Sequence, residues 1–140
     1  MRRFGLSMLA VVGALGISVM AANEKPSAAM MEVMKANAAT NGMANKAVKA
    51  NDYAVLLEAA GTYRANFAYI DAFFTHKKAD AGATLAQSGM KGAMALEAAA
   101  TAKDAAGVAK AMAAVTGTCG GCHKQFREQL ADKSYEIKLP

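Results

Sequence analysis

Apolar residues recur along this chain at helical spacing, and beyond the first two dozen residues no stretch alternates with the period of two expected of a strand. The clearest stripe has intervals of four, three, four, three and four: Leu56, Ala60, Tyr63, Phe67, Ile70 and Phe74. This spacing is typical of a helix packed along its length in a bundle. A second stripe lies near the C-terminus: Val108, Met112, Val115, Cys119, Cys122, Phe126 and Leu130. We therefore expect an all-α protein without strands.

Four helices are expected, followed by an extended tail, at about 27–50, 52–76, 80–102 and 104–131. Prolines occur only at Pro26 and Pro140, so no proline interrupts a helix between them. Residues whose side chains favour helix starts precede or open the four segments: Ser27, Asp52, Asp80 and Asp104. Short connections make successive helices antiparallel neighbours. The pattern predicts an up-down-up-down antiparallel four-helix bundle with both cysteines on the inward stripe of the last helix.

The third helix is the least supported, because Gly82, Gly89 and Gly92 each lower helix stability by up to about 1 kcal/mol relative to alanine. Glycines that face a neighbouring helix would allow the two backbones to approach closely.

The first 22 residues have the layout of a secretory signal peptide: two arginines, an apolar run over 4–20, then small residues. The run falls short of the ~20 residues that a membrane span needs. An uncleaved N-terminal anchor is the alternative. We expect cleavage near Ala21 or Ala22, a periplasmic protein with no stable membrane insertion afterwards, and a single domain over 23–140.

Removing Arg2 and Arg3 with the signal leaves 14 basic against 11 acidic side chains, a net charge of +3. This balance does not indicate a nucleic-acid-binding protein. It amounts to a mild preference for acidic partners.

The only two cysteines stand in the sequence Cys119-Gly120-Gly121-Cys122-His123. C-x-x-C-H is the attachment sequence for c-type haem, in which the thiols add across the two vinyl groups of the porphyrin and the histidine becomes an axial ligand of the iron. On a helix, Cys119 and His123 lie one turn apart on one face. Because bacteria attach this haem outside the cytoplasm, the expected signal peptide supports the same interpretation.

Two other uses of the motif, a redox or structural disulfide and a zinc site, fit less well. A thioredoxin-type C-x-x-C follows a strand at a helix N-terminus, whereas this one lies several turns into its expected helix. A plain disulfide across so short a loop would stabilise little. Structural zinc needs four ligands, and the only other histidine is His76, which we expect to be solvated at the end of the second helix.

A four-helix bundle with Cys119-Gly120-Gly121-Cys122-His123 in its last helix, followed by Phe126 and Arg127, resembles the class II cytochromes c. This family includes cytochrome c prime and its low-spin, methionine-ligated relatives. The resemblance implies one covalent haem c, with His123 as the proximal iron ligand and a residue of the first helix on the opposite side. The resemblance favours a place for Arg127 beside the haem, paired with a propionate or along the ring edge; a solvated arginine near Glu128 is the alternative. Three aromatic residues are expected as apolar walls of the pocket: Phe126, Phe67 and Tyr63.

Counting back from Lys49, whose surroundings resemble the end of the family's first helix, places Met34 at the distal position. Met30 and Met31 lie about one turn away and are alternatives. A third alternative is that no sixth ligand is present.

Histidine–methionine ligation favours ferrous iron and leaves no open position for a substrate. We therefore expect a one-electron carrier rather than an enzyme, exchanging electrons with redox partner proteins in the periplasm. A five-coordinate protein that binds nitric oxide or carbon monoxide, as in cytochrome c prime, is the alternative. Members of the family often pair through their first two helices, so a homodimer is a further expectation.

Overall fold

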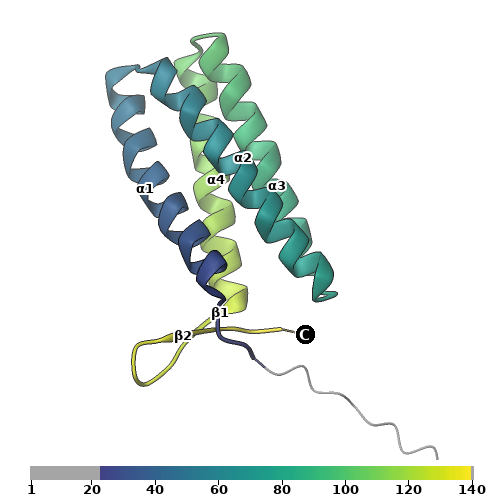
Figure 1. Cartoon of the computed structure of the whole chain (residues 1–140). Coiled ribbons are helices and arrows are strands. Elements are labelled where there is room, and N and C mark those ends of the chain that lie inside the picture. The colour runs from purple at the N-terminus through teal and green to yellow at the C-terminus, as the bar shows by residue number, and fades with distance from the viewer. Residues whose placement is uncertain (1–22, 140) are drawn as a thin grey trace, which may run out of the picture.

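The computed structural model describes residues 23–139, and the expected signal peptide lies outside them. The elements are α1 (Ala28–Ala50), α2 (Tyr53–His76), α3 (Asp80–Thr101), α4 (Ala105–Phe126), β1 (Arg127–Gln129) and β2 (Tyr135–Ile137). The four helices pack against one another in chain order, which confirms the all-α antiparallel four-helix bundle (Figure 1). In the described part of the chain, no helix has both the length and the apolarity required to cross a membrane.

Side-chain caps are present at the starts of α1 and α2, whereas α3 and α4 have none. Ser27 Oγ accepts a hydrogen bond from Met30 N at 3.1 Å, and Asp52 Oδ1 accepts one from Val55 N at 3.2 Å. These bonds satisfy amide groups that have no partner within the helix. Asp104 occupies the N-cap position of α4, as expected, but its side chain makes no capping hydrogen bond.

The stripe predicted on α2 forms the centre of the core. All six of its residues are buried, with exposed fractions of 4% or less. Burial of large side chains along the whole length of α2 accounts for its central place, because α2 packs on both α1 and α3.

Glycines on α3 let α2 and α3 approach closely. A Cβ atom added at Gly82 would lie 2.4 Å from Cγ of the Phe74 ring, and one added at Gly89 would lie 2.5 Å from the Phe67 ring. Both rings therefore pack directly on the α3 backbone. Glycine lowers the helix propensity at these two positions, but it allows two aromatic side chains to pack closely against the helix.

The C-terminal segment differs from the prediction. α4 ends at Phe126 rather than near 131, and residues 127–129 pair antiparallel with 135–137 as a β-hairpin. The expectations of an all-helical segment to 131 and of no strands are both wrong. Beyond Phe126, which packs on Phe74 with ring centroids 4.7 Å apart, helical residues would extend past the bundle and bury little. Strand pairing supplies the backbone hydrogen bonds instead.

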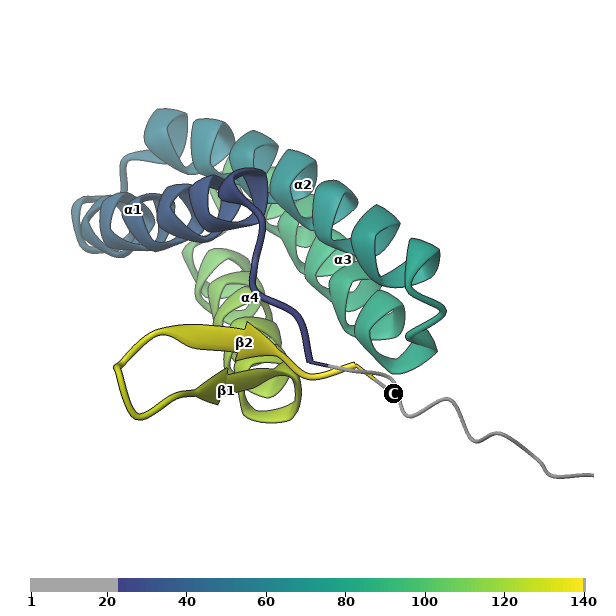
Figure 2. The ribbon, with the colours of Figure 1, turned by 60° about the horizontal axis from the view of Figure 1, so that its bottom comes forward.

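The hairpin is tied to the N-terminal end of the described chain (Figure 2). Glu24 N donates to Ile137 O at 3.0 Å, and Ile137 N donates to Glu24 O at 2.8 Å. An ion pair joins Glu24 to Lys77 just after α2. These contacts place a small layer of extended chain across the end of the bundle where α1 begins and α4 ends.

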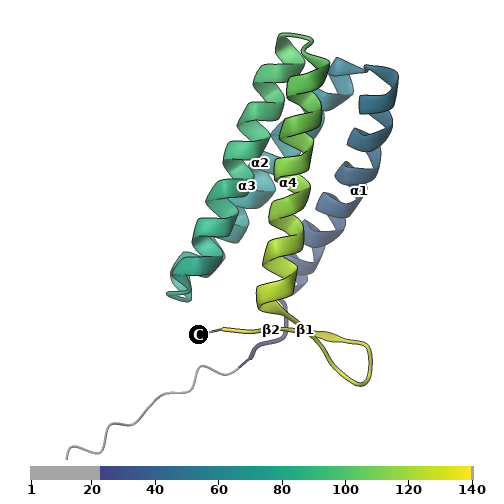
Figure 3. The ribbon, with the colours of Figure 1, turned by 180° about the vertical axis from the view of Figure 1, so that it is seen from behind.

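α1 packs on α2 but makes few contacts with α4. Figure 3 shows α4 lying between α3 and α1, with α1 and α4 closest near the hairpin and farther apart toward the opposite end. This incomplete closure leaves space between the first and last helices.

Replacing Gly82 with alanine is expected to destabilise the fold by about 1–3 kcal/mol, because the new methyl group would meet the root of the Phe74 ring. Gly61→Ala on α2 is the control: nothing lies within 4 Å of a Cβ atom there, and alanine is expected to stabilise the helix by up to about 1 kcal/mol. Urea denaturation monitored by circular dichroism measures both. Equal or greater stability of Gly82→Ala would show that the two helices are not in close contact.

Candidate functional site

The space between α1 and α4 contains a cavity of about 240 Å³ that is lined by residues from all four helices. The polar and sulfur-containing residues on its α1 and α4 walls are Met34, Asn37, Asn41, Thr116, Thr118, Cys119, Cys122 and His123. Phe67 and Ile70 from α2 form much of its apolar side. The residues that the sequence singled out at the two ends of the chain thus meet in one place.

A second cavity, of about 330 Å³, adjoins the first on the side of the hairpin. The two share four lining residues, Met34, Ala38, Cys122 and His123. Of these two cavities, Phe126 and Arg127 line the second, together with residues of β2. His123 and Met34 line both cavities.

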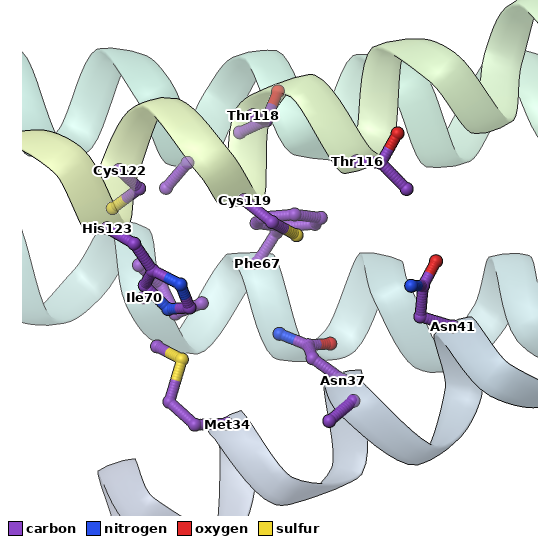
Figure 4. Close-up of a pocket in the computed structure, with 12 residues that line it drawn as sticks. Met34, Asn37, Asn41, Phe67, Ile70, Thr116, Thr118, Cys119, Cys122 and His123 are labelled. Carbon is purple, nitrogen blue, oxygen red and sulfur yellow. The ribbon is translucent and has the colours of Figure 1, made fainter.

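Met34 and His123 approach each other from opposite walls (Figure 4). Met34 extends from α1 with its thioether toward α4, and the imidazole of His123 extends from α4 toward α1. Met34 is half-buried and packs against the core.

The alternative methionines are placed differently. Met30 is 3% exposed and belongs to the core, whereas Met31 is 41% exposed. Both line the second cavity, but neither lines the cavity that contains Cys119. Of these three methionines, Met34 alone lines both cavities.

Cys119 and Cys122 are free thiols, each half-buried in the wall of the first cavity. Burial raises the pKa of the Cys119 thiol. Burial, together with the nearby charge of Cys119, raises the pKa of Cys122 to about 11. Both sulfurs are therefore protonated at neutral pH, unlike the thiolate of a redox-active C-x-x-C motif.

Burial lowers the pKa of His123, and the neighbouring Arg127 charge adds to this effect. The imidazole is consequently neutral at pH 7, with a nitrogen lone pair available. Neutral imidazole is the form in which histidine binds a metal.

Phe126 is buried and lines the second cavity, whereas Arg127 is exposed at the start of β1. The Arg127 guanidinium lies 4.6 Å from the centre of the Tyr135 ring, a stacking contact within the hairpin. Arg127 thus lines the second cavity from an exposed position beside the hairpin. Tyr63, expected as a pocket wall, is buried in the core and is not among the residues that line either cavity.

The sequence interpretation missed four polar residues of the site: Thr116 and Thr118 on α4, and Asn37 and Asn41 on α1. The two asparagines follow Met34 on α1 at intervals of three and four, the spacing of one helix face. This spacing could have identified both asparagines from the sequence. Two asparagines on the helix face that also carries the expected distal residue are unusual in an apolar pocket.

His76 is exposed at the end of α2, as expected of a solvated residue. Over residues 23–139, no cluster of three or more histidine, cysteine, aspartate or glutamate side chains is arranged to hold a metal ion. The pair formed by His123 and Met34 contains only one side chain of these four types, so it falls outside that definition.

Comparison of the chain with protein-family models, with curated proteins and with solved structures gave no match.

The stability of the fold is expected to decrease as the pH rises from about 10 toward 12. Burial, followed by the charge of Cys119, raises the pKa of Tyr63 to about 12, whereas a tyrosine in the unfolded chain ionises near 10. Ionisation of the unfolded state above pH 10 therefore favours unfolding until Tyr63 itself ionises. Denaturation midpoints across this range should fall more steeply for the parent protein than for Tyr63→Phe. Tyr69→Phe, which removes an exposed hydroxyl, should behave like the parent.

Proposed function

We propose that this chain is an exported monohaem c-type cytochrome that carries single electrons between proteins of the periplasm. The observation that carries the proposal is the convergence of two free thiols, a neutral imidazole and a thioether on one cavity between α1 and α4. The thiols and the imidazole have the order and spacing of a haem attachment sequence.

The dimensions and lining of the site are compatible with a haem. The two cavities have volumes of about 240 and 330 Å³ and share lining residues, and ligand sites in proteins typically measure about 300–1,000 Å³. Their walls are largely apolar, with Phe67, Ile70 and Phe126 as large contributors. An apolar wall suits a flat, hydrophobic cofactor.

Each residue of the site has a distinct part in this proposal. Cys119 and Cys122 anchor the cofactor to α4 through thioether bonds. His123 provides the proximal nitrogen ligand and Met34 the distal sulfur ligand. The bound haem supplies one-electron redox chemistry, and the chain sets its potential through these ligands and the exclusion of water.

Ligation of the haem iron on both of its sides favours electron transfer over catalysis. A methionine that fills the distal position leaves no place where a substrate could bind the iron. Because both ligands come from helices of a packed bundle, the site would change little between oxidation states. This property suits a protein that transfers single electrons on contact with partners.

Covalent haem attachment is expected to require both cysteines. Expressed with its signal peptide in a bacterium able to attach haem c, the chain should give a haem-stained band on a denaturing gel, and Cys119→Ser/Cys122→Ser should give none. His76→Ala, which changes a distant exposed histidine, should keep the stained band. A parent protein that folds and reaches the periplasm without covalent haem would refute the proposed function.

Replacing Met34 with alanine is expected to convert a low-spin haem protein into a high-spin one that binds carbon monoxide. Absorption spectra of the oxidised and reduced proteins, before and after carbon monoxide, measure this change, and the long-wavelength band of methionine–ferric ligation should be lost. Met31→Ala is the control, since Met31 is exposed and does not line the first cavity. A parent spectrum that is already high-spin and responds to the gas would favour the five-coordinate alternative instead.

A further inference from the structure

A buried asparagine stands on the distal wall of the site. Asn37 is 8% exposed, lies one turn after Met34 on α1, and lines the first cavity. Side chains three residues apart on a helix are neighbours, so its amide lies beside the Met34 thioether. A polar side chain this deeply placed requires hydrogen-bond partners to offset its loss of contact with water.

The hydrogen bonding of Asn37 fixes which end of its amide faces the cavity. Asn66 on α2 donates from Nδ2 to Asn37 Oδ1 at 2.9 Å. The oxygen is therefore occupied, and the nitrogen points elsewhere. Figure 4 shows the Asn37 nitrogen on the side of Met34 and His123, with the oxygen on the side of Asn41.

Within residues 23–139, the Asn37 amide nitrogen donates to no acceptor. No fully enclosed side-chain nitrogen or oxygen atom in this part of the chain lacks a partner. The Asn37 nitrogen is therefore not sealed within protein but open to the cavity. It presents an N–H donor to whatever occupies that space.

Asn41, one turn further along α1, repeats the arrangement. Its Oδ1 accepts hydrogen bonds from Tyr63 OH at 3.4 Å and from Asn45 Nδ2 at 3.3 Å. The amide nitrogen of Asn41 can therefore also donate into the first cavity, which Asn41 lines. No aspartate or glutamate is among the residues that line this cavity, so the donors face no competing carboxylate there.

We propose that Asn37 makes the distal side of the site a binding place for a small ligand with a hydrogen-bond acceptor, such as a small inorganic anion, when the Met34 sulfur is displaced. The inference rests on the proposed haem and on Met34 as the distal ligand. A ligand atom in the place of the sulfur would lie next to the Asn37 amide, which would donate to it. Asn66 is the positioning residue, because its own donor keeps the Asn37 nitrogen turned into the cavity.

Azide binding to the ferric, haem-loaded Met34→Ala protein tests this inference, since that variant opens the distal position. Adding Asn37→Leu should weaken azide binding on the order of tenfold or more, the effect of losing a hydrogen bond to a charged acceptor. Carbon monoxide binding to the ferrous forms should change far less, because its oxygen is a poor acceptor. Azide affinity is measured by titration of the haem absorption.

Two further variants separate hydrogen bonding from a general loss of packing. Asn37→Asp keeps the acceptor for Asn66 and nearly the same shape, and its ionised carboxylate cannot donate, so at a pH where this carboxyl group is ionised it should also weaken azide binding. Gln87→Leu is the matched control, because Gln87 is exposed, donates to Asp71 rather than to a residue of the site, and does not line the cavity. It should leave azide affinity unchanged.

The inference and the proposed function fail in different ways. If no haem is attached, the proposed function is wrong and the inference falls with it. If haem is attached but Met34→Ala binds no azide, or binds it equally well with asparagine or leucine at position 37, the inference alone is overturned. The azide affinity could be equal with asparagine and leucine at position 37 while the pH dependence of the reduction potential differs. That result would indicate that Asn37 donates to a haem carboxylate instead.

Discussion

The separation of α1 from α4 is the constraint on which the rest of this structure depends. α1 is held to the bundle through α2, and it contacts α4 only weakly. If all four helices closed tightly, their side chains would fill the interior and no cavity would remain. Instead, the last helix presents two thiols and an imidazole to a space whose opposite wall is the first helix.

The interface of α2 with α3 allows this opening without loss of the core. Gly82 and Gly89 bring the α3 backbone against Phe74 and Phe67, so much of the apolar packing lies between these two central helices. α1 is joined to α2 partly by polar contacts, such as the bond between Asn66 and Asn37. The same contact that locates α1 therefore also orients a donor toward the candidate site.

Most of the fold could be predicted from the sequence, because the information is local and repeated. The six-residue stripe of α2 is entirely buried, and three of the four helices end within about a residue of their expected bounds. The C-terminal end was wrong for a physical reason. Strands of three residues are too short for alternation to show, and the bridge that joins β2 to Glu24 depends on segments far apart in the chain.

At the site, the identity and helical phase of Cys119, Cys122 and His123 could be predicted without the structure, because covalent order and helix geometry fix both. The resemblance to class II cytochromes c suggested a few methionines on α1 as candidates for the residue opposite His123. The packing of α1 on α2 determines which of these methionines lies opposite His123, and this packing could not be predicted from the sequence. It also decided that Asn37 turns a donor into the cavity, because that orientation is imposed by Asn66 on another helix.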